Sequence, residues 1–307
     1  IFSTEISILR STMQRLLRRK SHRNISKILR NTHQADIALI MRSLNQYDQK
    51  KIFSLCPTAV HKARLLEELD ESLIGNVLEN DSVKNISKIF GYLDTNDQAT
   101  IIGMFQKRKQ KEILKAIEHG DKEDVEEIMS YPDDSAGSIM TKETFTLNQN
   151  TTVKESIEKL QSFPENDKIF YLYVLDNKEK LVGVVSLRTL VTSKNSKKLR
   201  EVMIKDIQAA TTSTDQEEVA KKVAQYNYLA LPIVNRQNRF LGIVTIDDVV
   251  DVIREEASED FLQMAGVGKD REILLKSPLE NAKSRAPWIL ASLIGGICAA
   301  AIISYFN

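Results

Sequence analysis

The chain repeats itself, and this internal repeat constrains its fold more than any other feature of the sequence. The segment MTKETFTLNQNTTVKESIEKL from Met140 aligns without gaps to MIKDIQAATTSTDQEEVAKKV from Met203, an offset of 63 residues. Further along, YVLDNKEKLVGVVSLRTLV from Tyr173 matches PIVNRQNRFLGIVTIDDVV from Pro232 at an offset of 59 residues. Each copy predicts a helix, a strand, a polar turn, a second strand and a second helix. We therefore expect two similar α/β units within residues 131–258, related by a pseudo-twofold axis.

Residues 1–130 carry helical patterning and no strand signal. Ile37, Ile40, Met41 and Leu44 follow the spacing of one helical face. Short polar breaks, such as the one from Asp94 to Asp97, separate several clusters of this kind. Helices this short bury little apolar surface alone. We therefore expect them to stack into an all-α superhelical domain.

The last 22 residues, 286–307, contain no Asp, Glu, Lys or Arg. A helix rises 1.5 Å per residue, so this length crosses a hydrocarbon layer of about 30 Å and predicts a transmembrane helix; a buried core helix is the alternative. Lys276, Lys283 and Arg285 precede it and place residues 1–285 on the cytoplasmic side. We expect further membrane segments to follow, as in a multi-pass protein of the cell membrane.

Charge is balanced overall but divided along the chain. The net charge of +1 argues against a nucleic-acid-binding protein. However, residues 1–30 hold eight Lys or Arg and one acid, whereas residues 247–260 hold seven acids and one Arg. The basic stretch is interpreted as a solvated helix face, with anionic lipid or nucleic acid as alternative partners. The sequence contains no nucleophile paired with a base, no P-loop and no G-x-G-x-x-G motif, so we predict that the chain is not an enzyme.

The acidic segment predicts a helix with carboxylates along one face and an apolar stripe along another, formed by Ile246, Val249, Val250, Ile253 and Ala257. Asp248, Asp251, Glu255 and Glu259 share the acidic face, and their repulsion is costly unless solvent, a basic partner or a cation compensates. Oxygen ligands without a nearby His or Cys favour Mg²⁺ or Ca²⁺. Thr245 and Asp248 also have the spacing of a capping box, so a structural role for Asp248 stays open.

The residues of the repeat resemble a tandem pair of CBS modules, with Gly183-Val-Val-Ser186 and Gly242-Ile-Val-Thr245 as the second strands. The order of parts along the chain resembles the MgtE family of magnesium channels and transporters. That order is a helical array, the motif Tyr131-Pro-Asp-Asp-Ser-Ala-Gly-Ser-Ile-Met-Thr141, two CBS modules, an acidic helix, a linker and a membrane helix. The fold class implied is multidomain, with an all-α superhelical N-terminal domain, an α/β CBS pair, a connecting helix and the start of an α-helical membrane domain. The parts implied are an N domain at 1–130, CBS domains at 131–200 and 201–258, a connecting (plug) helix at 259–285 and a first transmembrane helix at 286–307.

The resemblance implies a Mg²⁺-sensing cytosolic region. Intracellular Mg²⁺ would bridge acidic residues between domains, hold a homodimer compact through its CBS domains and close the pore, and low Mg²⁺ would open it. The positions that match the family's metal ligands are Asp81, Gly137, Asp215, Glu217, Asp248, Asp251, Glu256, Glu259 and Asp260. Asn85 and Asn227 stand where the family pattern carries acids, which predicts fewer or weaker ions between domains.

The resemblance also implies ATP binding in the CBS pair, at Tyr171, Arg188 and Tyr228. Aromatic rings can stack on adenine, and an arginine can meet a phosphate. Thr189 stands where an aspartate is expected, and Tyr228 has core packing as an alternative role. Two other functions stay open: a CorC-type exporter, in which the membrane segments precede the CBS pair, and a nucleotide-sensing CBS regulatory protein of another transporter or enzyme.

Overall fold

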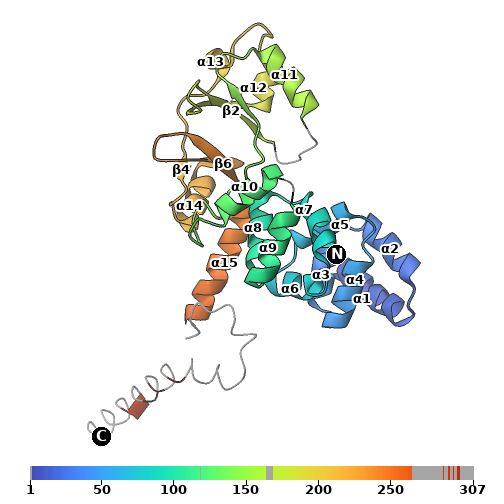
Figure 1. The fold of residues 1–307 in the computed structure, drawn as a ribbon. Helices are drawn as coiled ribbons and strands as arrows, with labels where there is room; N and C mark the ends of the chain where they lie inside the picture. Colours follow the sequence, from blue (N-terminus) through green and yellow to red (C-terminus); the bar gives the residue numbers. More distant parts are fainter. Residues whose placement is uncertain are drawn as a thin grey trace.

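The structure, a computed structural model, describes residues 2–117, 119–163 and 169–264, together with Ala286, Leu290, Leu293, Gly296 and Ile297. A helical N-terminal domain lies beside a region built from two α/β units, and a long helix leads away from the junction between them (Figure 1).

Short helices build the N-terminal domain, and most of them have eight to ten residues. Their bounds are α1 (Phe2–Arg18), α2 (His22–Asn31), α3 (Gln34–Arg42), α4 (Gln46–Ser54), α5 (Ala59–Leu66), α6 (Glu71–Leu78), α7 (Val83–Phe90), α8 (Thr95–Gly103), α9 (Lys107–Ala116) and α10 (His119–Ile128). The predicted all-α domain is confirmed.

Polar residues in the breaks between apolar clusters start many of these helices. The Asn45 side chain accepts a hydrogen bond from the backbone N–H of Asp48 at 2.9 Å, and Ser82 accepts one from Asn85 at 3.3 Å. Such caps satisfy backbone donors that have no partner inside a helix. The sequence breaks are therefore helix starts, and each short helix gains its stability from packing on its neighbours.

The two α/β units share one topology, as the sequence repeat predicts. The first contains β1 (Thr146–Asn148), α11 (Val153–Ser162), β2 (Tyr171–Leu175), β3 (Leu181–Ser186), α12 (Leu187–Thr192) and α13 (Leu199–Val202). The second contains β4 (Ala210–Thr211), α14 (Gln216–Tyr226), β5 (Ala230–Val234), β6 (Phe240–Thr245) and α15 (Ile246–Met264). In each sheet the first strand is parallel to the second, and the second is antiparallel to the third.

The segment that leads into each unit pairs with a strand of the other unit. Thr141, at the start of the first unit, exchanges backbone hydrogen bonds of 2.8 and 3.0 Å with Ile243 in β6. Ile204, at the start of the second, does the same with Val184 in β3, at 2.9 and 3.0 Å. This approach requires a glycine, because a Cβ on Gly242 would stand 2.5 Å from the Thr141 carbonyl oxygen. The exchange joins the two units into one body.

The N-terminal domain and the second unit share one hydrophobic core. Buried residues of α1, α8, α14 and α15 belong to this cluster, among them Met13, Ile102, Val223 and Val249. The first unit has a separate core, and a third cluster fills the junction between the two sheets. Helix α15 is continuous across residues 258 and 259, where the sequence predicted a boundary between the second CBS domain and the connecting helix.

Candidate functional site

The first turn of α8 is the point where the N-terminal domain is held by the α/β region. The backbone N–H of Thr95 donates to a carboxylate oxygen of Glu143 at 3.3 Å, and the Thr95 hydroxyl donates to the same oxygen at 3.1 Å. That hydroxyl also accepts from the backbone N–H of Lys142 at 3.1 Å. Asp94 directly precedes the helix but makes no capping hydrogen bond with its side chain. Glu143 therefore caps α8 from another domain and lies at the positive end of its dipole.

A second carboxylate holds the next residue of α8. The Asn96 side-chain amide donates to Asp248 Oδ1 at 2.9 Å. The other oxygen of Asp248 accepts from the backbone N–H of Thr245 at 3.1 Å and from the Thr245 hydroxyl. Asp248 thus stabilises the start of α15 in the manner of half a capping box and contacts the N-terminal domain as well. We refer to the contacts of Glu143 and Asp248 with Thr95 and Asn96 as the α8 clasp.

The two α8 side chains of the clasp are buried, and the partial burial of Glu143 changes its titration. Loss of solvent raises the pKa of Glu143, and the charge of Asp94 raises it further. Hydrogen bonds from Thr141 and from backbone N–H groups lower the pKa but do not cancel the rise. Thr95 is 2% exposed and Asn96 is 6% exposed. The carboxylate is therefore held in a partly shielded contact in which each of its donors matters.

An ion-pair cluster flanks the clasp on the side of α10. The Lys142 ammonium lies 3.3 Å from Asp124 and also contacts Glu127, which accepts a hydrogen bond of 2.7 Å from the Tyr131 hydroxyl. Burial alone would raise the pKa of Glu127, but the hydrogen bonds from Lys142 and Tyr131 lower it overall. The Lys142 side chain is only 16% exposed, so this cluster fixes the segment that enters the first α/β unit.

Some of the residues predicted as metal ligands meet at the start of α14. Gly137 lies against this region, where its backbone N–H donates to the Thr212 carbonyl at 3.0 Å. Asp215 caps α14 by accepting from the Glu217 N–H at 2.8 Å, and the neighbouring Gln216 donates to Glu256 of α15 at 2.9 Å. The structure thus brings Gly137, Asp215 and Glu256 to one end of α14.

The other predicted ligands are spread over the surface. Asp81 lies between α6 and α7, Glu217 pairs with Lys221 at 2.8 Å on α14, and Glu259 and Asp260 lie near the end of the described part of α15. Within residues 2–117, 119–163 and 169–264, no three His, Cys, Asp or Glu side chains converge as a metal cage. Metal binding at these positions stays a prediction.

Asp251 links the acidic face of α15 to the N-terminal domain electrostatically. The pKa of Asp251 is raised, mainly by loss of solvent and further by the charge of Asp247. Arg254, at 3.2 Å, and Arg42 of α3 act in the opposite direction. Arg42 itself forms two hydrogen bonds of 2.9 Å with Asp70. The acidic face therefore lies close enough to α3 for charges on the two domains to interact.

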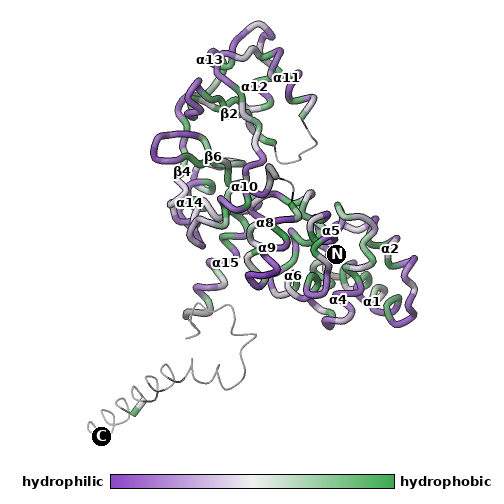
Figure 2. Tube along the Cα trace, viewed as in Figure 1, coloured by the Kyte–Doolittle hydropathy of each residue, from purple (hydrophilic) through white to green (hydrophobic). Residues whose placement is uncertain are grey.

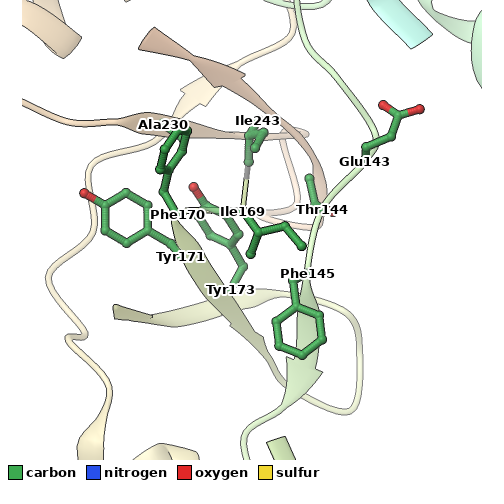
Figure 3. A pocket seen from close by; sticks show the side chains of 9 residues that line it. All are labelled: Glu143, Thr144, Phe145, Ile169, Phe170, Tyr171, Tyr173, Ala230 and Ile243. Carbon is green, nitrogen blue, oxygen red and sulfur yellow. The ribbon is translucent and has the colours of Figure 1, made fainter. Parts of the chain in front are cut away.

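Two of the three predicted nucleotide residues share a neighbourhood. Tyr171 lines a small cavity between the sheets, with the buried Tyr173 beside it (Figure 3). Tyr228 stacks on Tyr226 with ring centroids 5.5 Å apart, and burial, Tyr226, Asp206 and Tyr171 all raise its pKa. The cavity holds about 10 Å³, which is room for one water molecule. Nucleotide binding at Tyr171 and Tyr228 stays a prediction.

Arg188, the third predicted nucleotide residue, is exposed on α12. Thr189, which replaces the expected aspartate, donates its backbone N–H to the Ser186 hydroxyl at 3.1 Å. Ser186 thereby caps α12, so this corner of the first unit has an ordinary structural role.

Sequence reasoning missed Thr95, Asn96 and Glu143. The stretch from Asp94 to Asp97 was interpreted as a polar break, and polar residues there predict exposure. Thr95, Asn96 and Gln98 are instead buried, because α8 inserts its polar first turn between domains. Nothing in the periodicity of a single helix signals a partner that lies 48 or 152 residues away.

The predicted transmembrane helix at 286–307 lies almost entirely outside the described residues, as does most of the connecting segment at 259–285. Among the helices that the structure describes, none is both long enough and apolar enough to span a membrane.

Comparisons with known proteins agree with this architecture. The MgtE intracellular N domain matches residues 32–134, and CBS domains match residues 136–195 and 199–255. A magnesium transporter MgtE of Bacillus subtilis is 33% identical over 293 residues, which cover 91% of this chain and 64% of the relative. The chain belongs to the MgtE family. MgtE is not an enzyme family, so the prediction that the chain is not an enzyme is confirmed.

Other relatives of this MgtE-family chain give the same result. A magnesium transporter MgtE of Thermus thermophilus is 34% identical over 60% of this chain and 41% of its own length. The crystal structure of the cytosolic domain of the Mg²⁺ channel MgtE in complex with ATP is 29% identical, with a TM-score of 0.74, over 79% of this chain and 99% of that one. The chain spans 64% and 41% of the length of the two curated relatives described here.

Proposed function

We propose that this chain is the Mg²⁺-sensing cytosolic region of an MgtE-type magnesium channel or transporter. It would lie at the cell membrane with residues 1–285 cytoplasmic, a lipid-embedded helix at 286–307 and further membrane segments beyond. The observation that carries the proposal is helix α15, an acid-rich helix that belongs to the second CBS unit and is clasped by the N-terminal domain.

Helix α15 has three faces with different roles. Val249 and Val252 are buried against the fold. The acidic face includes Asp248, which contacts Asn96 of the N-terminal domain, and Asp251, on which the charge of Arg42 acts. A third face carries exposed apolar side chains at Val250, Ile253 and Phe261, the last 71% exposed.

The acidic face supports sensing of a divalent cation. The negative charge of Asp247 acts on Asp251, and a cation there would relieve the repulsion between the two carboxylates. Mg²⁺ keeps several of its waters and needs only one or two carboxylates from the protein, so it does not require a preformed cage. In this proposal, Mg²⁺ favours the state in which the N-terminal domain and α15 are close, and its loss separates them.

The exposed apolar face supports a homodimer. Three large apolar side chains on one helical face are costly in water, and a second copy of the chain is the partner that a symmetric channel requires. We propose that the CBS regions pair in this way and that the pore lies on the symmetry axis.

ATP binding in the CBS pair is a second proposed activity of the same region. It is supported by the neighbouring positions of Tyr171 and Tyr228 and by the related cytosolic domain of the Mg²⁺ channel MgtE, which was solved in complex with ATP. The nucleotide would modulate the sensor.

Trypsin cleavage after Lys142 tests the sensor, because this side chain is only 16% exposed in the docked state and becomes accessible when the domains separate. The chain, reconstituted in lipid nanodiscs, is titrated with Mg²⁺ to about 20 mM against NaCl of matched ionic strength, since salt alone screens repulsion. We expect Mg²⁺ to slow this cleavage more than NaCl does.

Matched variants separate specific ions from net charge. Asp251→Asn with Glu255→Gln and Glu259→Gln should abolish the Mg²⁺ response. Three exposed acids elsewhere provide the control: Glu68→Gln, Glu123→Gln and Glu158→Gln. Equal responses to Mg²⁺ and NaCl, together with protection by ATP alone, would replace the metal sensor with the nucleotide-regulated alternative.

A further inference from the structure

Helices α1 and α2 form a strongly basic surface, which we call the basic hairpin and which comprises residues 2–31. The hairpin contains one acid, Glu5. All of its lysines and arginines are at least partly exposed: Arg10, Arg15, Arg18, Arg19, Lys20, Arg23, Lys27 and Arg30. Figure 2 shows hydrophilic residues along much of α1 and α2.

The basic side chains of α2 occupy the helical face opposite to the one that packs. In α2, Arg23, Lys27 and Arg30 follow the i, i+4, i+7 spacing of one face, whereas Ile25 and Leu29 on the opposite side are buried. The hairpin is thus a folded amphipathic element with its charge turned outward.

An apolar side chain stands within the charged face of α1. Ile8 is 61% exposed, and Arg15 lies seven residues beyond it on the same helical face. Met13, on the opposite side of the helix, is fully buried. This combination of an arginine and an exposed aliphatic side chain is typical of helices that lie in a membrane interface.

The charges of the basic hairpin are not neutralised within the protein. In the part of the chain that the structure describes, none of the eight cationic side chains takes part in an ion pair. The following helices differ, because Arg42 pairs with Asp70 at 2.9 Å and Lys50 pairs with Glu79 at 2.6 Å. The family match to the N domain begins at residue 32, directly after the hairpin. The matched part of the family's N domain therefore does not include the basic hairpin.

We propose that the basic hairpin binds the anionic phospholipid surface of the membrane in which the protein is anchored. This inference rests on the proposed membrane location, but not on Mg²⁺ sensing. Each Lys or Arg near an anionic leaflet adds to the attraction, and Ile8 can enter the headgroup region. Single-stranded nucleic acid fits less well, because residues 3–46 contain no Phe, Tyr or Trp on which bases could stack. The acids of α15 fit less well as a partner, because that face lies toward the N-terminal domain of its own chain.

The test uses the full chain in nanodiscs of phosphatidylcholine, with or without about 30 mol% phosphatidylserine. Trypsin cleavage after Arg18, Arg19 or Lys20, in the exposed turn between α1 and α2, reports access to the hairpin. Cleavage after the exposed Lys194 and Lys197 provides the internal reference. We expect phosphatidylserine to slow hairpin cleavage about tenfold, and about 0.5 M NaCl to restore it.

Two charge variants make the test specific. The first variant removes three charges from the hairpin but keeps the cleavage sites; it combines Arg23→Gln, Lys27→Gln and Arg30→Gln. It should abolish the protection of the hairpin by phosphatidylserine. Its control removes three exposed lysines with helical spacing from α9: Lys107→Gln, Lys111→Gln and Lys115→Gln. This control should keep the protection.

Several results would overturn the proposal. One is equal cleavage of the hairpin in nanodiscs with and without phosphatidylserine. Another is equal loss of protection in the hairpin variant and in the α9 control. A third is protection of the hairpin in neutral nanodiscs by an oligonucleotide or by raised protein concentration. A chain that enters nanodiscs without protection refutes the hairpin inference alone. A chain that does not enter them refutes the membrane location, and the hairpin inference with it.

Discussion

Replacing Thr95 by valine removes one hydroxyl from the α8 clasp while keeping the shape of the side chain. That hydroxyl donates to Glu143 at 3.1 Å and accepts from the Lys142 N–H at 3.1 Å, in a site where Thr95 is 2% exposed. A hydrogen bond to a charged group contributes about 1.5–3 kcal/mol, and the Lys142 N–H would also lose its partner. We expect Thr95→Val to weaken docking of the N-terminal domain by about 2–3 kcal/mol.

Access to Lys142 measures this loss. At about 1.4 kcal/mol per factor of ten, a weakening of about 2 kcal/mol raises the open population about 30-fold, and trypsin cleavage after Lys142 should accelerate accordingly. Thr58→Val is the matched control, because it removes a hydroxyl that caps α5 within the N-terminal domain. It should cost about 1 kcal/mol locally without changing cleavage at Lys142.

The clasp reasoning would be refuted by a rate change of less than about twofold in Thr95→Val, or by an equal change in Thr58→Val. A double-mutant cycle with Glu143→Gln completes the test, because the two substitutions affect the same contact and their effects should not add.

Three further results are expected. The pKa of Glu143 is raised in the docked state, so protonation of this carboxyl group favours docking. Docking is therefore strongest below the ordinary carboxyl pKa and weakens as the pH rises through the raised pKa. Glu143→Gln should flatten the pH profile of trypsin cleavage after Lys142. Gly242→Ala places a Cβ 2.5 Å from the Thr141 carbonyl oxygen. It should lower the free energy of unfolding, measured by urea denaturation, by about 1–3 kcal/mol. The control Gly75→Ala lies in open space within α6 and should not lower the free energy of unfolding. Tyr171→Ala should weaken ATP binding about tenfold in calorimetry, because stacking of an aromatic ring on a base contributes about 1–3 kcal/mol; unchanged affinity would move the nucleotide site elsewhere.

The repeated α/β architecture could be predicted from the sequence because it is local and occurs twice. Short apolar runs define the longer strands, and Gly183 and Gly242 mark the two equivalent strands, where a Cβ would meet the Met203 side chain and the Thr141 backbone, respectively. The short helices of the N-terminal domain were also predictable, since their apolar spacing and polar breaks lie within a few residues of one another. Whether the predicted ligands bind Mg²⁺ depends on distances that no local pattern contains.

The tertiary structure decided how these parts meet. The sequence assigned the residues from Asp94 to Asp97 to a break, yet Thr95 and Asn96 are the residues that two carboxylates hold across the domain junction. It grouped Val249, Val250 and Ile253 into one apolar stripe, yet packing buries Val249 and leaves Val250 and Ile253 exposed. Periodicity reports which residues share a face of one helix. Which neighbour covers that face depends on contacts between distant segments, and only the folded chain fixes those.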